Sequence, residues 1–222
     1  SGVALVLIVG GWVKVPDDPG QSAQQRRPLR KGLTTPGGRP VLAVVISWML
    51  AHNILYTYIA PFVAPAGLLG RVDLVLLVFG IAALVGIWIT AKLVDPLLRS
   101  TVLVSLVAFG ATCVAFGFLS EVPGVIYLGM AIWGLSFGGA ATLLQTALAD
   151  AAGDGADVAL SLNVVAWNLA IAGSGVVGGV LLDTWGVVSF PWAMLVLLAV
   201  GFVIAWAARS SGFKPGRRDA GK

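Results

Sequence analysis

The sequence contains one histidine, His52, and the residues around it are well suited to contact a bound solute. This histidine lies within residues 41–60, a stretch that carries no charged side chain. On a helix, Trp48, His52 and Tyr56 share one face because they are spaced four residues apart, and Asn53 lies beside them. Polar side chains are costly in hydrocarbon and usually face a cavity or another helix. We therefore expect this polar, aromatic stripe to bind a small molecule. Its imidazole, with a pKa in water of about 6.5, is also suited to carry a proton.

Three further amides lie inside apolar stretches, namely Gln145, Asn163 and Asn168. Each is a candidate substrate contact, and a hydrogen bond to another helix is the alternative for each. On a helix Asn163 aligns with Trp167, whereas Asn168 points about 140° away from Asn163. The two asparagines therefore cannot both face one cavity squarely.

Nothing in the sequence predicts an enzyme, a metal site or a cofactor site. No apolar stretch contains paired carboxylates, and a single histidine has no set of partners for nucleophilic catalysis. Cys113 is the only cysteine and is expected to pack as a small apolar residue. The glycines of residues 173–179 resemble a dinucleotide-binding motif, but they lie inside a long apolar stretch instead of a strand–turn–helix unit. Glycines spaced four apart, as here and within residues 134–138, favour close packing of helices instead.

The composition is that of a membrane protein. Hydrophobic residues make up 58% of the chain and charged residues 11%, and the mean hydropathy is +0.95. Soluble domains average about 25% charged residues. The net charge of +4 would also fit a nucleic-acid partner, but the basic residues cluster in two short segments that flank apolar stretches. That arrangement is typical of cytoplasmic loops, so no nucleic-acid partner is expected.

The order of apolar and polar stretches predicts an all-α membrane protein with six transmembrane helices. Residues 1–13 are apolar but too short to cross a core of about 30 Å, so they are expected to end a truncated transmembrane helix. Residues 14–39 are rich in proline and basic side chains and predict a solvated linker. Residues 40–208 form the expected bundle in the lipid bilayer, and residues 209–222 form a basic tail. The six apolar segments cover residues 41–62, 73–94, 101–119, 124–148, 158–182 and 187–208.

The positive charges predict how the bundle is oriented. If the 14–39 linker is cytoplasmic, only Arg71 of the 14 Lys and Arg residues lies outside, which leaves 13 inside. An excess of Lys and Arg marks the cytoplasmic side of a membrane protein. We therefore expect a multi-pass protein of the cell inner (plasma) membrane, with the linker and the C-terminus in the cytoplasm.

One short loop carries a recognisable family motif. Residues 91–99, Ala-Lys-Leu-Val-Asp-Pro-Leu-Leu-Arg, resemble the cytoplasmic loop motif of the major facilitator superfamily, Gly-x-Leu-x-Asp-Arg-x-Gly-Arg-Arg. Leu93, Asp95 and Arg99 occupy matching positions, and the loop is similar to the degenerate second copy of the motif. The resemblance implies that Asp95 and Arg99 form a gating loop, and an ordinary Asp-Pro turn is the alternative. Four positions depart from the motif: Ala91, Pro96, Leu98 and Ser100.

Three other stretches resemble the same family, in the order in which the family carries them. Residues 52–62, His-Asn-Ile-Leu-Tyr-Thr-Tyr-Ile-Ala-Pro-Phe, resemble the seventh helix of bacterial arabinose, sugar and drug efflux permeases. Residues 133–145 and 161–179 resemble the tenth and eleventh helices. The chain is thus similar to the C-terminal six-helix half of a major facilitator superfamily transporter.

This resemblance implies proton-coupled efflux of a small organic solute such as a sugar, nucleoside or drug. The missing N-terminal six-helix half, or a second chain, is the implied protein partner. Every Asp and Glu lies in a loop or at the end of an apolar segment, so we expect the proton-coupling acid in the missing half, with His52 as the alternative. A six-helix membrane scaffold or binding protein without transport activity is the alternative function.

Overall fold

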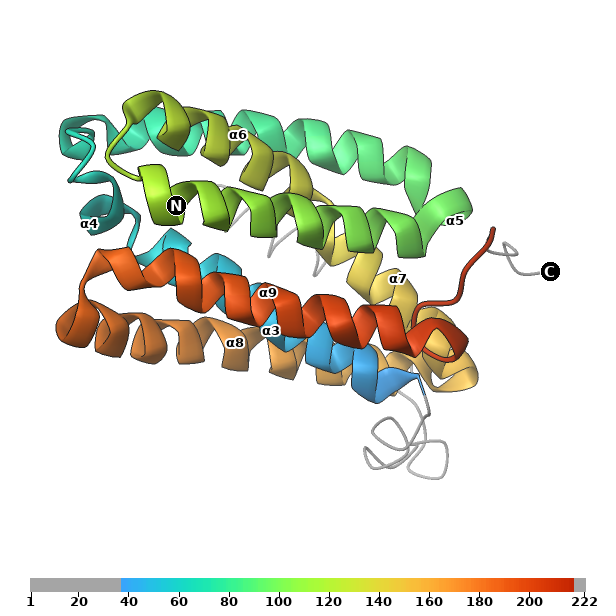
Figure 1. Ribbon diagram of the computed structural model, residues 1–222. Coiled ribbons are helices and arrows are strands. Elements are labelled where there is room, and N and C mark those ends of the chain that lie inside the picture. The colour runs from blue at the N-terminus through green and yellow to red at the C-terminus, as the bar shows by residue number, and fades with distance from the viewer. Residues whose placement is uncertain (1–36, 218–222) are drawn as a thin grey trace, which may run out of the picture.

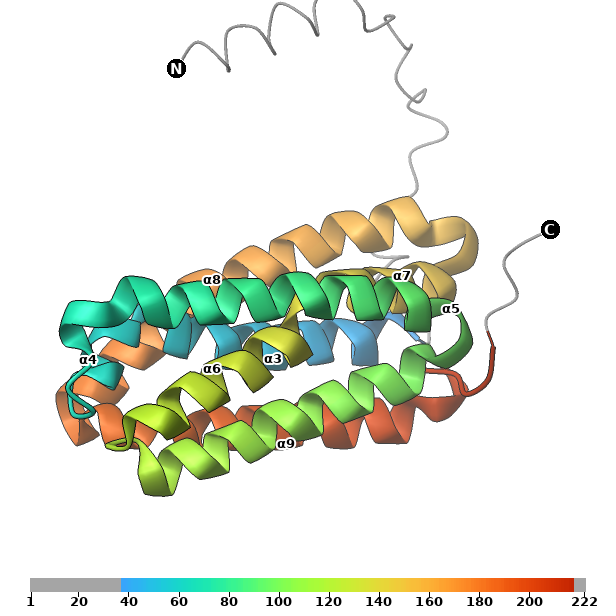
Figure 2. The ribbon, with the colours of Figure 1, turned by 90° about the horizontal axis from the view of Figure 1, so that it is seen from above.

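The computed structural model describes residues 37–217, and this part of the chain consists of helices and connecting turns without a strand. Figures 1 and 2 show the long helices running side by side in an elongated bundle. The expected helix end at 1–13 and nearly all of the expected 14–39 linker lie outside the described residues. The elements are α3 (Gly38–Thr57), α4 (Ile59–Val63), η1 (Leu69–Arg71), α5 (Val72–Leu119), α6 (Pro123–Gly138), α7 (Ala140–Ala152), η2 (Gly153–Gly155), α8 (Ala156–Trp185), η3 (Val187–Ser189), α9 (Phe190–Ala207) and η4 (Ala208–Ser210).

Four helical stretches of the described chain are long and apolar enough to cross a membrane: Gly38–Thr57, Leu69–Leu119, Pro123–Trp185 and Val187–Ser210. The two middle stretches contain 51 and 63 residues. At about 1.5 Å per residue, either one is more than twice as long as a bilayer core of about 30 Å is thick. Both of them therefore need a reversal of direction.

Each reversal has a local cause. Within α5, Pro96 is followed by Leu97 with the non-helical angles φ −139° and ψ 30°. There the chain doubles back, so that α5 forms two arms that diverge from the turn, with α6 between them in Figure 2. The second reversal lies between α7 and α8 at Gly153, whose φ of 51° is a left-handed value that favours glycine. The two arms of α5 contain the apolar segments predicted over 73–94 and 101–119. The helices before and after Gly153 contain those predicted over 124–148 and 158–182.

Two helices are interrupted where the sequence predicted continuous segments. The segment expected over 41–62 breaks at Tyr58, because Pro61 has no N–H to donate to Thr57 and its ring crowds that carbonyl. The segment expected over 124–148 breaks at Gly139, which separates α6 from α7. Glycine is a weak helix former, and a Cβ atom at this position would overlap the side chain of Thr90.

The central element is α3. In its most apolar window 61% of residues are buried, against 22–28% in the other membrane-length stretches. The α3 helix packs between α8 and α9, while the arms of α5 pack against α6 and α9. Its side chains are therefore surrounded by protein on most sides, and that is the position the polar stripe around His52 occupies.

Candidate functional site

The His52 side chain lies at the centre of an aromatic cluster. Its ring is stacked on Phe137 of α6, with centroids 3.5 Å apart and planes 3° apart. Tyr56, one turn further along α3, stacks on it at 5.5 Å, and Trp133 of α6 lies 5.1 Å away. His52 is only 8% exposed, and its Nδ1 atom is buried without a hydrogen-bond partner. The cluster therefore holds the imidazole by ring contacts instead of hydrogen bonds.

A pocket of about 310 Å³ opens beside this cluster. Its walls come from α3, α5, α6, α7 and α8, so one small volume is lined by five helices. Most of its large side chains are aromatic, and hydrogen-bonding groups are few. Such a mixture of apolar walls with a few polar groups is typical of sites for small molecules. The lining residues are His52, Tyr56, Phe79, Ala83, Ile87, Phe137, Gly138, Ala141 and Trp167.

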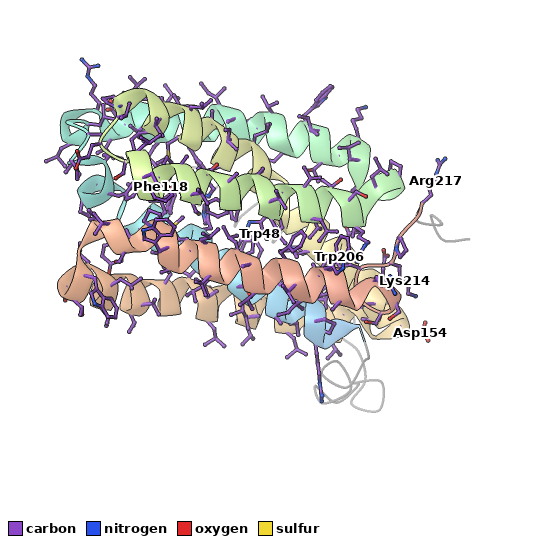
Figure 3. The ribbon with its side chains drawn as sticks, in the orientation of Figure 1. Trp48, Phe118, Asp154, Trp206, Lys214 and Arg217 are labelled. Atoms are coloured by element: carbon purple, nitrogen blue, oxygen red, sulfur yellow. The ribbon has the colours of Figure 1, made fainter. Side chains whose placement is uncertain are left out.

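Trp48, the third member of the predicted stripe, does not line this pocket. Its side chain is completely buried near the middle of the bundle (Figure 3) and meets Phe137 edge-on, with centroids 6.3 Å apart. Its indole N–H is buried without a partner, as is that of Trp133. Trp48 therefore supports the ring on which His52 is stacked.

The predicted amides are distributed around the pocket and do not line it. Asn53 is half-buried and donates to the carbonyl of Met49, 2.8 Å away. Gln145 is exposed on α7, one helical turn beyond Ala141 of the pocket wall.

The two asparagines of α8 point in different directions, as their spacing predicted. Asn163 is 2% exposed, and its Oδ1 atom is buried without a hydrogen-bond partner. It lies one turn from Trp167, which lines the pocket. Asn168 is exposed and donates to the carbonyl of Val164 at 2.8 Å. Asn163 therefore has an unused acceptor close to the site, whereas the amide of Asn168 bonds to its own helix.

Sequence reasoning missed part of the pocket wall. Phe79, Ala83 and Ile87 recur every four residues along the first arm of α5 and contribute one side of the pocket. This spacing places the three side chains on one helix face. In an apolar segment, however, that pattern is the same for a lipid-facing side and a pocket wall, so no sequence signal distinguished them.

The loop residue Arg99 connects the turn of α5 to the end of α9. Its guanidinium donates to the carbonyl oxygens of Ala205 at 2.8 Å, Trp206 at 3.0 Å and Phe213 at 3.1 Å. It also lies 5.5 Å from the ring centroid of Trp206. A cation at a helix C-terminus is favourable because the last carbonyls carry partial negative charge. Asp95, its expected companion, is exposed in the same turn.

The described residues contain no group of three or more His, Cys, Asp or Glu side chains that could hold a metal ion. The acidic side chains in this part of the chain lie near helix ends or in turns, away from the aromatic cluster. The pocket is therefore suited to binding through ring faces and a few hydrogen bonds.

Comparison with known proteins gives a consistent family assignment. The sequence model of the Major Facilitator Superfamily matches residues 1–175. The chain is 25% identical over 211 residues to a "Probable sugar efflux transporter" of Mannheimia succiniciproducens, covering 91% of this chain and 51% of that protein. It is 24% identical over 212 residues to a protein of the same name from Helicobacter pylori strain J99, covering 90% and 52%. It is 29% identical over 209 residues to the "Purine ribonucleoside efflux pump NepI" of Salmonella enteritidis, covering 89% and 51%. The chain spans about half the length of these curated relatives.

Proposed function

Because the chain belongs to the major facilitator superfamily, we propose that it forms the C-terminal six-helix half of an efflux transporter for a small organic solute. Proteins of this family are membrane transporters and not enzymes, as the sequence predicted. They contain two six-helix halves, with the substrate bound between them near the membrane midplane. In this proposal α3, the two arms of α5, α6 with α7, α8, and α9 each cross the membrane once.

We propose the pocket beside His52 as the substrate contact of this half. The aromatic side chains that line it are the main support for this proposal. Rings from four helices, Tyr56, Phe79, Phe137 and Trp167, border one volume together with the imidazole. Flat aromatic faces suit a sugar ring or a nucleobase, and the curated relatives are named for a sugar and for a purine ribonucleoside. A sugar, nucleoside or similarly sized drug is therefore the proposed cargo.

The exposed amides of α7 and α8 support a protein partner that covers these two helices. Gln145 of α7 and Asn168 of α8 are exposed inside membrane-length stretches, and these two helices pack against each other. An amide facing lipid is costly, so such side chains normally face a protein partner or a water-filled cavity. We assign this side to the central cavity and the second six-helix half, supplied by the same protein or by another chain.

Proton coupling and orientation are part of the proposal. His52 lines the pocket, but its ring is stacked on aromatic neighbours and is mostly buried, so we place the coupling acid in the other half. The predicted bundle, residues 40–208, would have its 14–39 linker and 209–222 tail in the cytoplasm. Lys214 and Arg217 lie at one end of the bundle (Figure 3), whereas Arg71 belongs to η1 near the other end. That distribution agrees with the excess of positive charge expected inside.

The test is uptake of labelled pentoses, hexoses and purine ribonucleosides into everted membrane vesicles that contain the complete transporter. We expect a pH gradient to drive uptake of one of these classes. Replacing Tyr56 by alanine should raise KM about 2- to 12-fold, the range expected for the loss of one ring contact. His52→Ala should raise KM as well, because it removes a second side chain from the pocket wall.

A matched control is Phe118→Ala. Phe118, labelled in Figure 3, is an aromatic side chain of α5 that is 73% exposed and does not line the pocket, so its loss should leave KM unchanged. Equal effects of Tyr56→Ala and Phe118→Ala would contradict the assigned site. If His52→Ala lowers only the amount of protein in the membrane, the histidine has a packing role. Uptake that ignores the pH gradient would contradict proton coupling.

A further inference from the structure

A second pocket, of about 340 Å³, lies at the end of the bundle where α5 turns. It shares no lining residue with the pocket beside His52. Leu98 of the α5 turn and Ala147 and Asp150 of α7 form one side. The segment that follows α9, including Lys214 and Arg217, forms the other side. In Figure 3 both cations lie at this end of the bundle, close to Trp206 and away from Trp48.

This pocket depends on a segment that is firmly attached to the bundle. The side chain of Phe213 is completely buried. Its carbonyl oxygen accepts a hydrogen bond of 3.1 Å from Arg99, which also binds the carbonyl of Ala205 at 2.8 Å. Lys214 directly follows this attachment point, and Arg217 lies three residues further on. The chain therefore places two exposed cations at the mouth of the pocket.

The charge of the lining favours an anionic ligand. Lys214 and Arg217 contribute two positive charges and Asp150 one negative charge, so the lining has a formal charge of +1. A phosphodiester, with a charge of −1, balances this sum.

The position of the pocket favours a lipid as the source of that phosphodiester. Trp206 is 59% exposed and lies at the same end of the bundle as the two cations (Figure 3), and exposed tryptophans at helix ends mark the membrane–water interface. Phospholipid headgroups lie at that depth, and basic pockets between transmembrane helices bind anionic headgroups. Leu98 and Ala147 provide apolar surface for the part of a lipid that adjoins its phosphate.

From these observations we propose that the pocket between the α5 turn, α7 and the segment after α9 binds an anionic phospholipid of the adjacent leaflet through its phosphodiester. Lys214 and Arg217 contact the phosphate. This site is separate from the proposed substrate contact and does not depend on which solute is transported.

The test titrates the complete purified protein in neutral detergent with dioleoyl phosphatidylglycerol and counts bound lipid by native mass spectrometry. We expect Lys214→Gln and Arg217→Gln each to weaken binding about fivefold, and the double variant about 25-fold. Lys92→Gln is the matched control, because Lys92 is exposed near the same turn but does not line the pocket. This control should bind the lipid as the unmodified protein does.

Competition with soluble anions distinguishes a lipid site from a general anion site. Glycerophosphoglycerol, the headgroup without acyl chains, and sodium phosphate should fail to displace the lipid at equal concentration. Displacement by either would overturn the lipid assignment, and an equal loss of binding in Lys92→Gln would overturn the pocket itself. The transport assay is separate, so failure of this proposal leaves the proposed function unaffected.

Discussion

The contact between α6 and the first arm of α5 depends on glycine. Adding one methyl group to this contact should show how closely the two helices pack. A Cβ atom at Gly134 would overlap the carbonyl oxygen of Phe79 and lie 3.0 Å from the Cβ of Ala82. The same holds in reverse at Gly86, where a Cβ would overlap the carbonyl oxygen of Leu135. A glycine of each helix thus lies directly against the backbone of the other helix. The variant Gly134→Ala should therefore force the two helices apart.

The magnitude follows from comparison with a glycine that has free space. In the same arm of α5, a Cβ at Gly80 would meet nothing within 4 Å. Both Gly134→Ala and Gly80→Ala gain about 0.5–1 kcal/mol from the better helix propensity of alanine. Only Gly134→Ala carries the cost of overpacking, about 1–3 kcal/mol. The difference in free energy of unfolding between the two variants should therefore equal the overpacking cost.

The only cysteine of the chain provides the assay. Cys113 is completely buried, so a thiol-reactive fluorescent dye reports unfolding as the detergent-solubilised protein is heated. A change of 1 kcal/mol shifts the midpoint by about 2–4 °C, so Gly134→Ala should unfold about 2–12 °C below Gly80→Ala. If the two midpoints agree to within about 1 °C, the reasoning about this interface is wrong.

The remaining predictions concern hydrogen bonds. Tyr58→Phe removes a bond of 2.6 Å from the tyrosine hydroxyl to the carbonyl of Gly175 and should cost about 0.6 kcal/mol in the same dye assay. Tyr127→Phe is its control: that hydroxyl is buried without a partner, so its removal should be neutral or stabilising, and a larger loss than in Tyr58→Phe would contradict this. Arg99→Lys replaces a planar group bonded to three carbonyls by a point charge, so limited trypsin digestion should cut after Arg209 and release the segment that follows α9 at least several-fold faster than in the unmodified protein. An unchanged rate of cleavage would show that Arg99 does not hold this segment.

Much of the architecture could be predicted from local sequence. Long apolar segments separated by charged or proline-containing turns predict membrane-length helices, because backbone groups in hydrocarbon must be satisfied within the chain itself. The breaks at Tyr58 and Gly139 were not predicted. Pro61 does disfavour the helix before it, but whether a proline kinks or ends a helix depends on what packs around the freed backbone groups.

The candidate site was predictable only within single helices. The four-residue spacing of His52 and Tyr56 fixed their common face, and the spacing of Asn163 and Asn168 fixed their divergence. The sequence could not show that Phe137 of α6 would stack 3.5 Å from the imidazole, or that Phe79 and Trp167 would complete the pocket. These contacts join residues more than 25 positions apart, and their geometry depends on how the helices cross.

By itself, the sequence determined that the chain is an apolar, helical membrane protein with one polar, aromatic stripe. Composition and helical periodicity are local properties, and they need no knowledge of which helix lies beside which. Only the tertiary structure decided that Trp48 supports the cluster from within the core and that the loop residue Arg99 binds the end of α9. In an apolar segment, the sides of a helix that face lipid, a neighbouring helix or a pocket all carry similar side chains. Only the packing of the helices shows which side is which.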